Sequence, residues 1–243
     1  PAGQWWIPQP PVMFESSPDR DALGSFLSGD CSRILLDVLV LPDTFAFSPA
    51  LAETTISEIL GRLGDDQGLL VDWMMLVQVV GDRPIGETHV SRLIPIIQKT
   101  QFHQLVEADV AHGLWVFEWC VGQLMWLPNA ATAAALGAAL IQITETLRDW
   151  CERAPSETGT VDPGTAASSL VLNAVGLALV PTDVGERVDR LASTLGEIID
   201  IWPATRPGAL MVANSVLRRV SPEIAGSIRR LLVRLRAMEA SPI

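Results

Sequence analysis

Residues 104–153, QLVEADVAHGLWVFEWCVGQLMWLPNAATAAALGAALIQITETLRDWCER, form the longest stretch of apolar helical pattern in the chain. On a helical wheel the first half, Gln104–Leu127, has no polar face, and a helix that is apolar all round is buried on all sides. Pro128 stops that helix, and Asn129 is a suitable N-cap for the next. The pattern therefore predicts two long antiparallel helices, 104–127 and 130–153, that meet at Pro128-Asn129.

Three tryptophans share one stripe of the first predicted helix. Trp115, Trp119 and Trp126 recur at spacings of 4 and 7, and His112 lies one turn before them. The second helix begins with an Ala- and Gly-rich run, which lets bulky indoles approach closely. We expect a core hairpin in which the tryptophans pack over this run. The alternative is an open pocket lined by His112, Trp115 and Trp119; a base-stacking platform would also need a positive groove, which the segment lacks.

The rest of the chain reads as further helices, so the predicted fold class is all-α. Four pairs place a capping side chain before proline at the first helical position and so mark helix starts: Ser17-Pro18, Ser48-Pro49, Asp162-Pro163 and Ser221-Pro222. Short joints favour antiparallel neighbours, and helix pairs recur about every 40 residues, as in HEAT or armadillo solenoids. An irregular helical bundle stays open. The eleven expected helices lie near 18–28, 32–41, 49–63, 66–80, 87–100, 104–127, 130–153, 163–180, 183–201, 207–219 and 222–238.

The pattern suggests an arm followed by two helical regions. Residues 1–16 are rich in Trp and Pro and predict an extended arm whose Trp5 and Trp6 pack on its own helical body or dock into another subunit. Residues 17–154 hold the buried hairpin, and residues 165–243 end in a basic helix. The loop 154–164 is the one candidate boundary, and a single continuous domain remains open.

Composition narrows the classes of partner and the compartment. A net charge of −11 argues against general affinity for nucleic acid or anionic membrane. Cys31, Cys120 and Cys151 are few and odd in number, which predicts a reducing intracellular compartment, cytoplasmic or nuclear. The uncharged windows 119–144 and 163–182 are interrupted or bracketed by proline, so we expect buried helices there and not membrane spans.

Arginines gather near the C-terminus, where residues 201–243 hold seven Arg against two Glu. On the last predicted helix they lie opposite an apolar stripe, and two further arginines on the preceding helix extend the group. This face is either solvated, paired with acidic parts of the same chain, or a site for an acidic partner or phosphate, which arginine binds in bidentate fashion. The candidate partner-binding residues are Arg218, Arg219, Arg229, Arg230, Arg234 and Arg236, together with Trp5 and Trp6.

Catalytic patterns are weak throughout the sequence. His112 and Cys120 are eight residues apart on one predicted helix, about 12 Å along it and out of hydrogen-bond reach. No metal-ligand spacing, phosphate loop or nucleophile motif occurs, so we expect no cofactor. The sequence favours a non-enzymatic scaffold or adaptor subunit that binds protein partners. The alternatives are a self-assembling, capsid- or nucleoprotein-like subunit, with homo-oligomers, and an enzyme or lipid-binding protein with a Trp-lined pocket.

Overall fold

The structure, a computed structural model, describes residues 49–65, 70–81, 84–153 and 161–240. Within these ranges it contains ten α-helices, one short 3-10 helix and no strand, which confirms the all-α prediction. The predicted arm 1–16 and the predicted helices 18–28 and 32–41 lie outside the described residues. The contacts divide the chain into two compact units, residues 1–83 and 84–243. The loop 154–164, the candidate boundary in the sequence, falls inside the second unit.

The described part of the first unit is a helical hairpin of α4 (Pro49–Gly64) and α5 (Leu70–Val80), which pack on each other. Leu60 and Trp73 are almost fully buried. Arg62 of α4 forms an ion pair with the buried Asp72 of α5, at 2.6 Å between Nη2 and Oδ1. Helix α5 ends at Val80, and the following Gly81 has a positive φ of 64°, a left-handed conformation that glycine adopts without steric cost.

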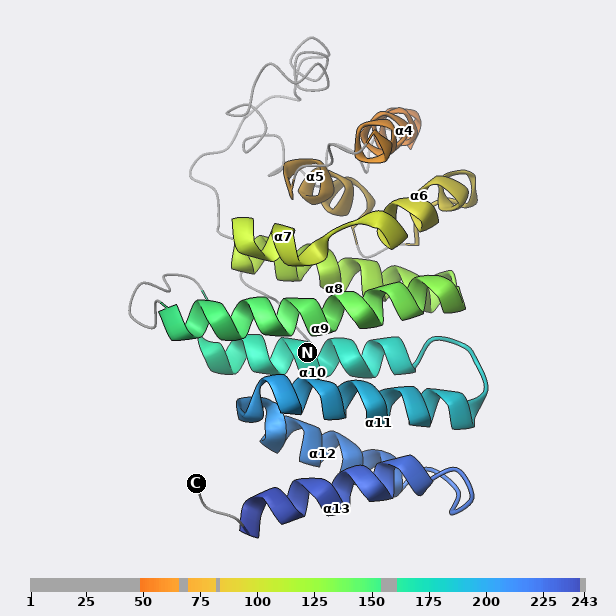
Figure 1. The fold of residues 1–243 in the computed structure, drawn as a ribbon. Coiled ribbons are helices and arrows are strands. Elements are labelled where there is room, and N and C mark those ends of the chain that lie inside the picture. The colour runs from red at the N-terminus through yellow and green to blue at the C-terminus, as the bar shows by residue number, and fades with distance from the viewer. Residues whose placement is uncertain (1–48, 66–69, 82–83, 154–160, 241–243) are drawn as a thin grey trace. The chain divides into compact units, whose positions relative to one another are not determined.

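The second unit is a stack of helices arranged as two rows (Figure 1). In the first row α8, α10 and α12 contact one another in turn, and in the second row α9, α11 and α13 do the same. Helices α6 and α7 pack on α9 as well. The elements are α6 (Glu87–Lys99), α7 (Phe102–Ala108), α8 (Val110–Trp126), α9 (Ala130–Arg153), α10 (Pro163–Ala178), α11 (Val184–Ile201), the 3-10 helix η1 (Pro203–Thr205), α12 (Arg206–Leu217) and α13 (Gly226–Ala240).

The prediction of one continuous helix over 104–127 is wrong, because the chain bends at Asp109. That residue is extended (φ −157°, ψ 115°), and its carboxylate accepts the backbone N–H of His112 as an N-cap of α8. Gly113 lets the two short helices cross closely: a Cβ there would lie 2.6 Å from the Val106 backbone. The bend shifts the helical register, but α8 by itself still lacks a charged side, since Glu118 is its only Asp, Glu, Lys or Arg residue.

The expectation that the tryptophan stripe is wholly buried is also wrong. Trp119 is buried and Trp115 is half-buried, but Trp126 is 60% exposed at the end of α8. Only one side of the Ala-rich start of α9 lies in the core, where Ala133, Leu136 and Leu140 are fully buried. The alanines of the other side are exposed: Ala130, Ala131, Ala134 and Ala138. Helix α9 contacts α6, α7, α8, α10 and α11, so its small residues serve several neighbours and not the indoles alone.

Capping side chains mark the start of four described helices, α8, α9, α10 and α11. The predicted caps are confirmed for α9, where Asn129 accepts the N–H of Thr132, and for α10, where Asp162 accepts two N–H groups beside Pro163. The predicted start at Ser221-Pro222 is wrong, because residues 222–224 form a turn and α13 begins at Gly226. Ser48 lies outside the described residues, so the cap predicted for α4 stays a prediction.

One described helix, α9, is long and apolar enough to cross a membrane when only its length and composition are considered. Core helices of water-soluble proteins meet the same criterion, and about half of the relevant part of α9 is buried by neighbouring helices. The helix therefore gives no information about location.

Candidate functional site

Helix α13 closes the second row, and among the described residues one of its sides has no neighbouring helix. Its apolar stripe, Ile228, Leu231, Leu232 and Leu235, is buried against α11 and α12. The opposite side carries arginines at helical spacing, so the amphipathic pattern itself aims them outward. All six predicted arginines are exposed, and we call them the basic face: Arg218, Arg219, Arg229, Arg230, Arg234 and Arg236.

Acidic residues of the same chain engage part of the basic face. Arg234 forms an ion pair with Asp200 of α11. Arg229 contributes to a lowered pKa of the Glu223 carboxyl, which chiefly results from hydrogen bonds to that carboxyl, first from the Ser221 side chain. Pairing of the C-terminal arginines with acidic residues of the same chain, one of the alternatives from the sequence, therefore occurs for Arg234 and in part for Arg229.

The remaining arginines keep their guanidinium groups available. Within the described residues, the side chains of Arg218, Arg219, Arg230 and Arg236 make no hydrogen bond or ion pair. Arg218 and Arg219 follow the last residue of α12, where the negative end of the helix dipole favours cations. The side chain of Arg230 folds back toward Gly226 at the start of α13. Unpaired guanidinium groups are therefore concentrated around the α12–α13 turn and along α13.

An apolar residue interrupts the basic face. Val233 lies one turn after Arg229 and one turn before Arg236, and it is 68% exposed. Residues at i, i+4 and i+7 lie on one face of a helix, so these three side chains form a basic–apolar–basic stripe. Such a stripe offers carboxylate contacts at both ends and an apolar contact between them.

The predicted pocket residues belong to the first turns of α8. His112 donates its backbone N–H to Asp109 at 3.0 Å, and its Nδ1 lies 3.1 Å from the same carboxylate oxygen. Although partial burial raises the pKa of Asp109, the hydrogen bonds from His112 lower it below its ordinary value. His112 thus takes part in the cap of α8, while Trp119 lies in the core. Trp115 is half-buried on the outer side of α8.

The remaining reactive or metal-ligating side chains do not form a site among the described residues. Cys120 and Cys151 are free, and burial raises the pKa of both thiols, far more for Cys120. Among the described residues, no group of three or more His, Cys, Asp or Glu side chains is arranged to hold a metal ion. Cys31, Trp5 and Trp6 lie outside the described residues.

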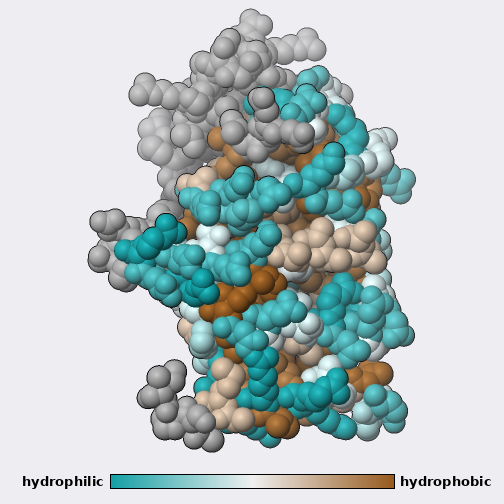
Figure 2. Space-filling view, viewed as in Figure 1, coloured by the Kyte–Doolittle hydropathy of each residue, from teal (hydrophilic) through white to brown (hydrophobic). Residues whose placement is uncertain are grey.

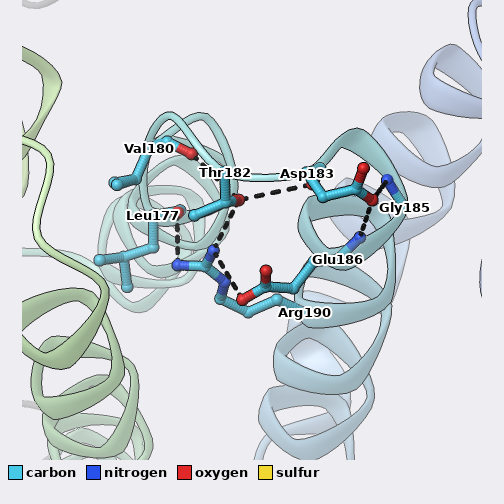
Figure 3. A network of polar contacts seen from close by, with 7 residues as sticks. All are labelled: Leu177, Val180, Thr182, Asp183, Gly185, Glu186 and Arg190. Atoms are coloured by element: carbon cyan, nitrogen blue, oxygen red, sulfur yellow. Dashed lines mark hydrogen bonds and ion pairs between the residues drawn. The ribbon is translucent and has the colours of Figure 1, made fainter.

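A polar network at the α10–α11 turn is more extensive than the sequence indicates (Figure 3). Arg190 lies one turn after Glu186, and the closest atoms of this ion pair are 4.0 Å apart. Arg190 also donates to the carbonyl of Leu177 at 3.3 Å and to the hydroxyl of Thr182 at 3.2 Å. It therefore satisfies an end carbonyl of α10 from the neighbouring helix, which is a structural role in fixing the turn.

The visible face of the second unit is largely hydrophilic around α9 to α13, with hydrophobic residues in small separate areas (Figure 2). Comparison of the chain with family models, curated proteins and solved structures gives no match.

Proposed function

We propose that the second unit is a helical-pair solenoid and acts as a non-enzymatic scaffold or adaptor that binds an acidic segment of a partner protein on the basic face. The row-by-row contacts of α8, α10 and α12 and of α9, α11 and α13 support the solenoid, since each helix pair then contacts only its neighbours. Solenoids of this kind offer long lateral surfaces to their partners, and α13 is the last helix of the second row.

One observation carries the proposal. Four exposed arginines of the basic face have no side-chain partner among the described residues, on a protein whose net charge is −11. A cluster of unpaired like charges raises the energy of the free protein slightly, and a carboxylate-bearing ligand relieves it. Arginine is well suited to this task because its planar guanidinium binds carboxylates in bidentate fashion.

The stripe Arg229–Val233–Arg236 favours a peptide over a nucleic acid. A phosphate backbone uses the arginines alone, whereas an acidic peptide also brings an apolar side chain to the exposed Val233. Asp200 and Glu223, which lie beside Arg234 and Arg229, repel anionic ligands of either kind, so the exposed Val233 is what distinguishes the peptide from the nucleic acid. The favoured ligand is therefore a short acidic segment with at least one apolar residue.

The free thiols Cys120 and Cys151 support the further proposal that the protein works in a reducing, intracellular compartment. A binding function in such a compartment needs neither a cofactor nor a metal.

The test is a binding titration with two defined probes. Fluorescence anisotropy compares a short peptide in which Glu and Asp flank a central Leu with a thymidine oligonucleotide of equal charge. The wild-type protein should bind the peptide more tightly. The variant Arg229→Glu/Arg230→Glu/Arg236→Glu should bind the peptide about tenfold or more weakly, because exposed ion pairs contribute about 0.2–1 kcal/mol each.

A matched control keeps the change in net charge and moves it elsewhere. Arg92→Glu/Lys99→Glu/Arg187→Glu reverses three cations on α6 and α11 and should leave the affinity for the peptide unchanged. Equal losses in both triple variants, or tighter binding of the oligonucleotide by the wild-type protein, would refute the proposed ligand.

A further inference from the structure

The two rows of the second unit differ sharply in charge. Helices α8, α10 and α12 contain two Asp, Glu, Lys or Arg residues, Glu118 and Arg206, and α10 contains none. Helices α9, α11 and α13 contain sixteen. Since a water-facing helix ordinarily has a charged outer side, the first row is unusual for a row of helices that borders solvent.

Each helix of the first row nevertheless has a solvent-exposed stripe. On α10 the residues with exposed or half-buried side chains recur at helical spacing, as they do on α8 and α12, and the buried residues face the second row and the neighbouring helices. Five of the large apolar side chains that are exposed in the described chain lie on these stripes or at their ends: Met125, Trp126, Leu172, Leu179 and Met211. We call the combined outer side of α8, α10 and α12 the uncharged face.

The α8 and α10 stripes are neighbours. A Cβ on Gly176 would lie 2.8 Å from the side chain of Val121, so the two helices touch at this level. Met125 is one turn beyond Val121 along α8, and Leu179 is one turn beyond Gly176 along α10. Met125 and Leu179 therefore lie near the seam between α8 and α10.

The uncharged face also has open spaces next to its large side chains. Gly122 is exposed, and a Cβ there would meet no atom within 4 Å. Trp126 lies one turn after it and is 60% exposed, and Leu172 on α10 is 56% exposed. Projecting side chains beside small residues are the elements from which well-packed contacts between helices are built.

From these observations we infer that the uncharged face is a homodimer interface, which packs against the same face of a second copy of the chain. A two-fold contact brings each surface against itself, so any patch of one charge sign would repel its own copy. On a protein with a net charge of −11, the face that lacks Asp and Lys and holds a single Glu is best suited to such a contact. Glu118 is half-buried, which limits even that charge.

The available area agrees with a stable dimer. The 17 residues of α8 give a length of about 25 Å, and three helices at spacings of about 9 Å give a width of about 28 Å. The resulting footprint is about 700 Å², before surface relief is counted. Standard interfaces bury about 800 Å² per partner, so three helices suffice.

The test is the molar mass of the full chain in solution. Sedimentation equilibrium of the wild-type chain, whose monomer mass is 26.3 kDa, should give a dimer at micromolar concentrations. The variant Leu172→Glu/Met211→Glu places four carboxylates in the contact and should be monomeric, or dissociate at least a hundredfold more readily. Both positions are more than half exposed, so circular dichroism should show an unchanged helix content.

Two further samples make the result specific. The control Gln142→Glu/Val184→Glu adds the same charge at exposed positions of α9 and α11 and should remain dimeric. An equimolar mixture of the Leu172→Glu/Met211→Glu variant with Leu172→Lys/Met211→Lys should restore the dimer through opposite charges. A monomeric wild-type chain would overturn the inference. Cross-links from the uncharged face to residues 1–83, or sedimentation of the protein with phosphatidylcholine vesicles, would then identify what covers the face instead. If the mixture of the Glu and Lys variants stays monomeric, the inference is also overturned.

Discussion

A glycine-to-alanine pair on α8 tests the bend at Asp109 quantitatively. A Cβ at Gly113 would lie 2.6 Å from the Cα and N atoms of Val106 and 2.7 Å from the carbonyl carbon of Leu105. Non-bonded carbon atoms prefer about 3.5–4.0 Å, so α7 would have to move away by about 1 Å. Gly122 lies on the same helix, and a Cβ there meets nothing within 4 Å.

The two substitutions share one favourable term and differ in one unfavourable term. Alanine in a helix is favoured over glycine by about 0.8–1 kcal/mol, and this gain applies to both positions. Overpacking against backbone, which cannot rotate away as a side chain does, costs about 1–3 kcal/mol and applies to Gly113 alone. Gly122→Ala should therefore be slightly more stable than wild type, and Gly113→Ala should be about 1–3 kcal/mol less stable than Gly122→Ala.

Thermal and urea unfolding, followed by circular dichroism at the helix band, measure this difference. For a protein of this size 1 kcal/mol corresponds to about 2–4 °C in Tm, so the two variants should differ by about 2–12 °C. Because the chain has two compact units, the transition of the second unit is the one to compare. If Gly113→Ala melts at or above the temperature of Gly122→Ala, the close crossing of α7 and α8 is refuted.

Three further predictions concern single ionisable side chains. Burial raises the pKa of Glu118, so the folded protein should lose stability as the pH rises from 4.5, the ordinary pKa of a glutamate, toward the raised pKa. Glu118→Gln should therefore raise Tm at pH 7 and leave it unchanged at pH 4. The exposed Glu145→Gln should leave Tm unchanged at both pH values. The lowered pKa of Asp109 stabilises the folded protein above pH 3.8, and this stability is lost as the pH falls through the pKa of the folded state. Asp109→Asn should therefore make Tm less dependent on pH on the acid side. An unchanged dependence of Tm on pH would contradict this. Arg190→Met removes two hydrogen bonds at the α10–α11 turn and should lower the free energy of unfolding, measured in urea, by about 2 kcal/mol. The control Arg187→Met should lower it by less than about 0.5 kcal/mol. Equal losses of stability in the two variants would argue against the network.

The helices could be predicted from sequence wherever a local signal marks an end. Asn129 and Asp162 are capping side chains beside proline or at the start of an apolar run, and both caps are confirmed. Ser221-Pro222 carries the same signal, yet the chain makes a turn there before α13 begins. A local motif gives the preference of a few residues, and tertiary packing decides whether that preference is used.

Tertiary contacts account for what sequence periodicity missed. The bend at Asp109 depends on Gly113 meeting the backbone of α7, a contact between residues on different helices. Asp109 followed by His112 and Gly113 does hold a weak signal, because Asp is a common N-cap. The reach of Arg190 to Leu177 spans 13 residues of sequence and could not be read from i,i+4 pairing.

The candidate site was partly predictable. Amphipathic spacing alone predicts that Arg229, Arg230, Arg234 and Arg236 share the outer side of the last helix, and all four are exposed. The pairing of Arg234 with Asp200 of α11 depends on which helix packs beside α13, and the sequence gives no information on that order. The uncharged face was missed for the same reason, since it exists only once α8, α10 and α12 form one row.

The central claim is that the unpaired arginines of the basic face bind a carboxylate-bearing partner while the paired ones maintain the fold. Arginine Nε–H resonances in a ¹⁵N-labelled sample report this directly during titration with the acidic peptide. The signals of Arg218, Arg219, Arg230 and Arg236 should shift in proportion to occupancy, and that of Arg190, held in the α10–α11 network, should stay in place. Shifts confined to arginines outside the basic face, or no shifts at peptide saturation, would contradict the claim.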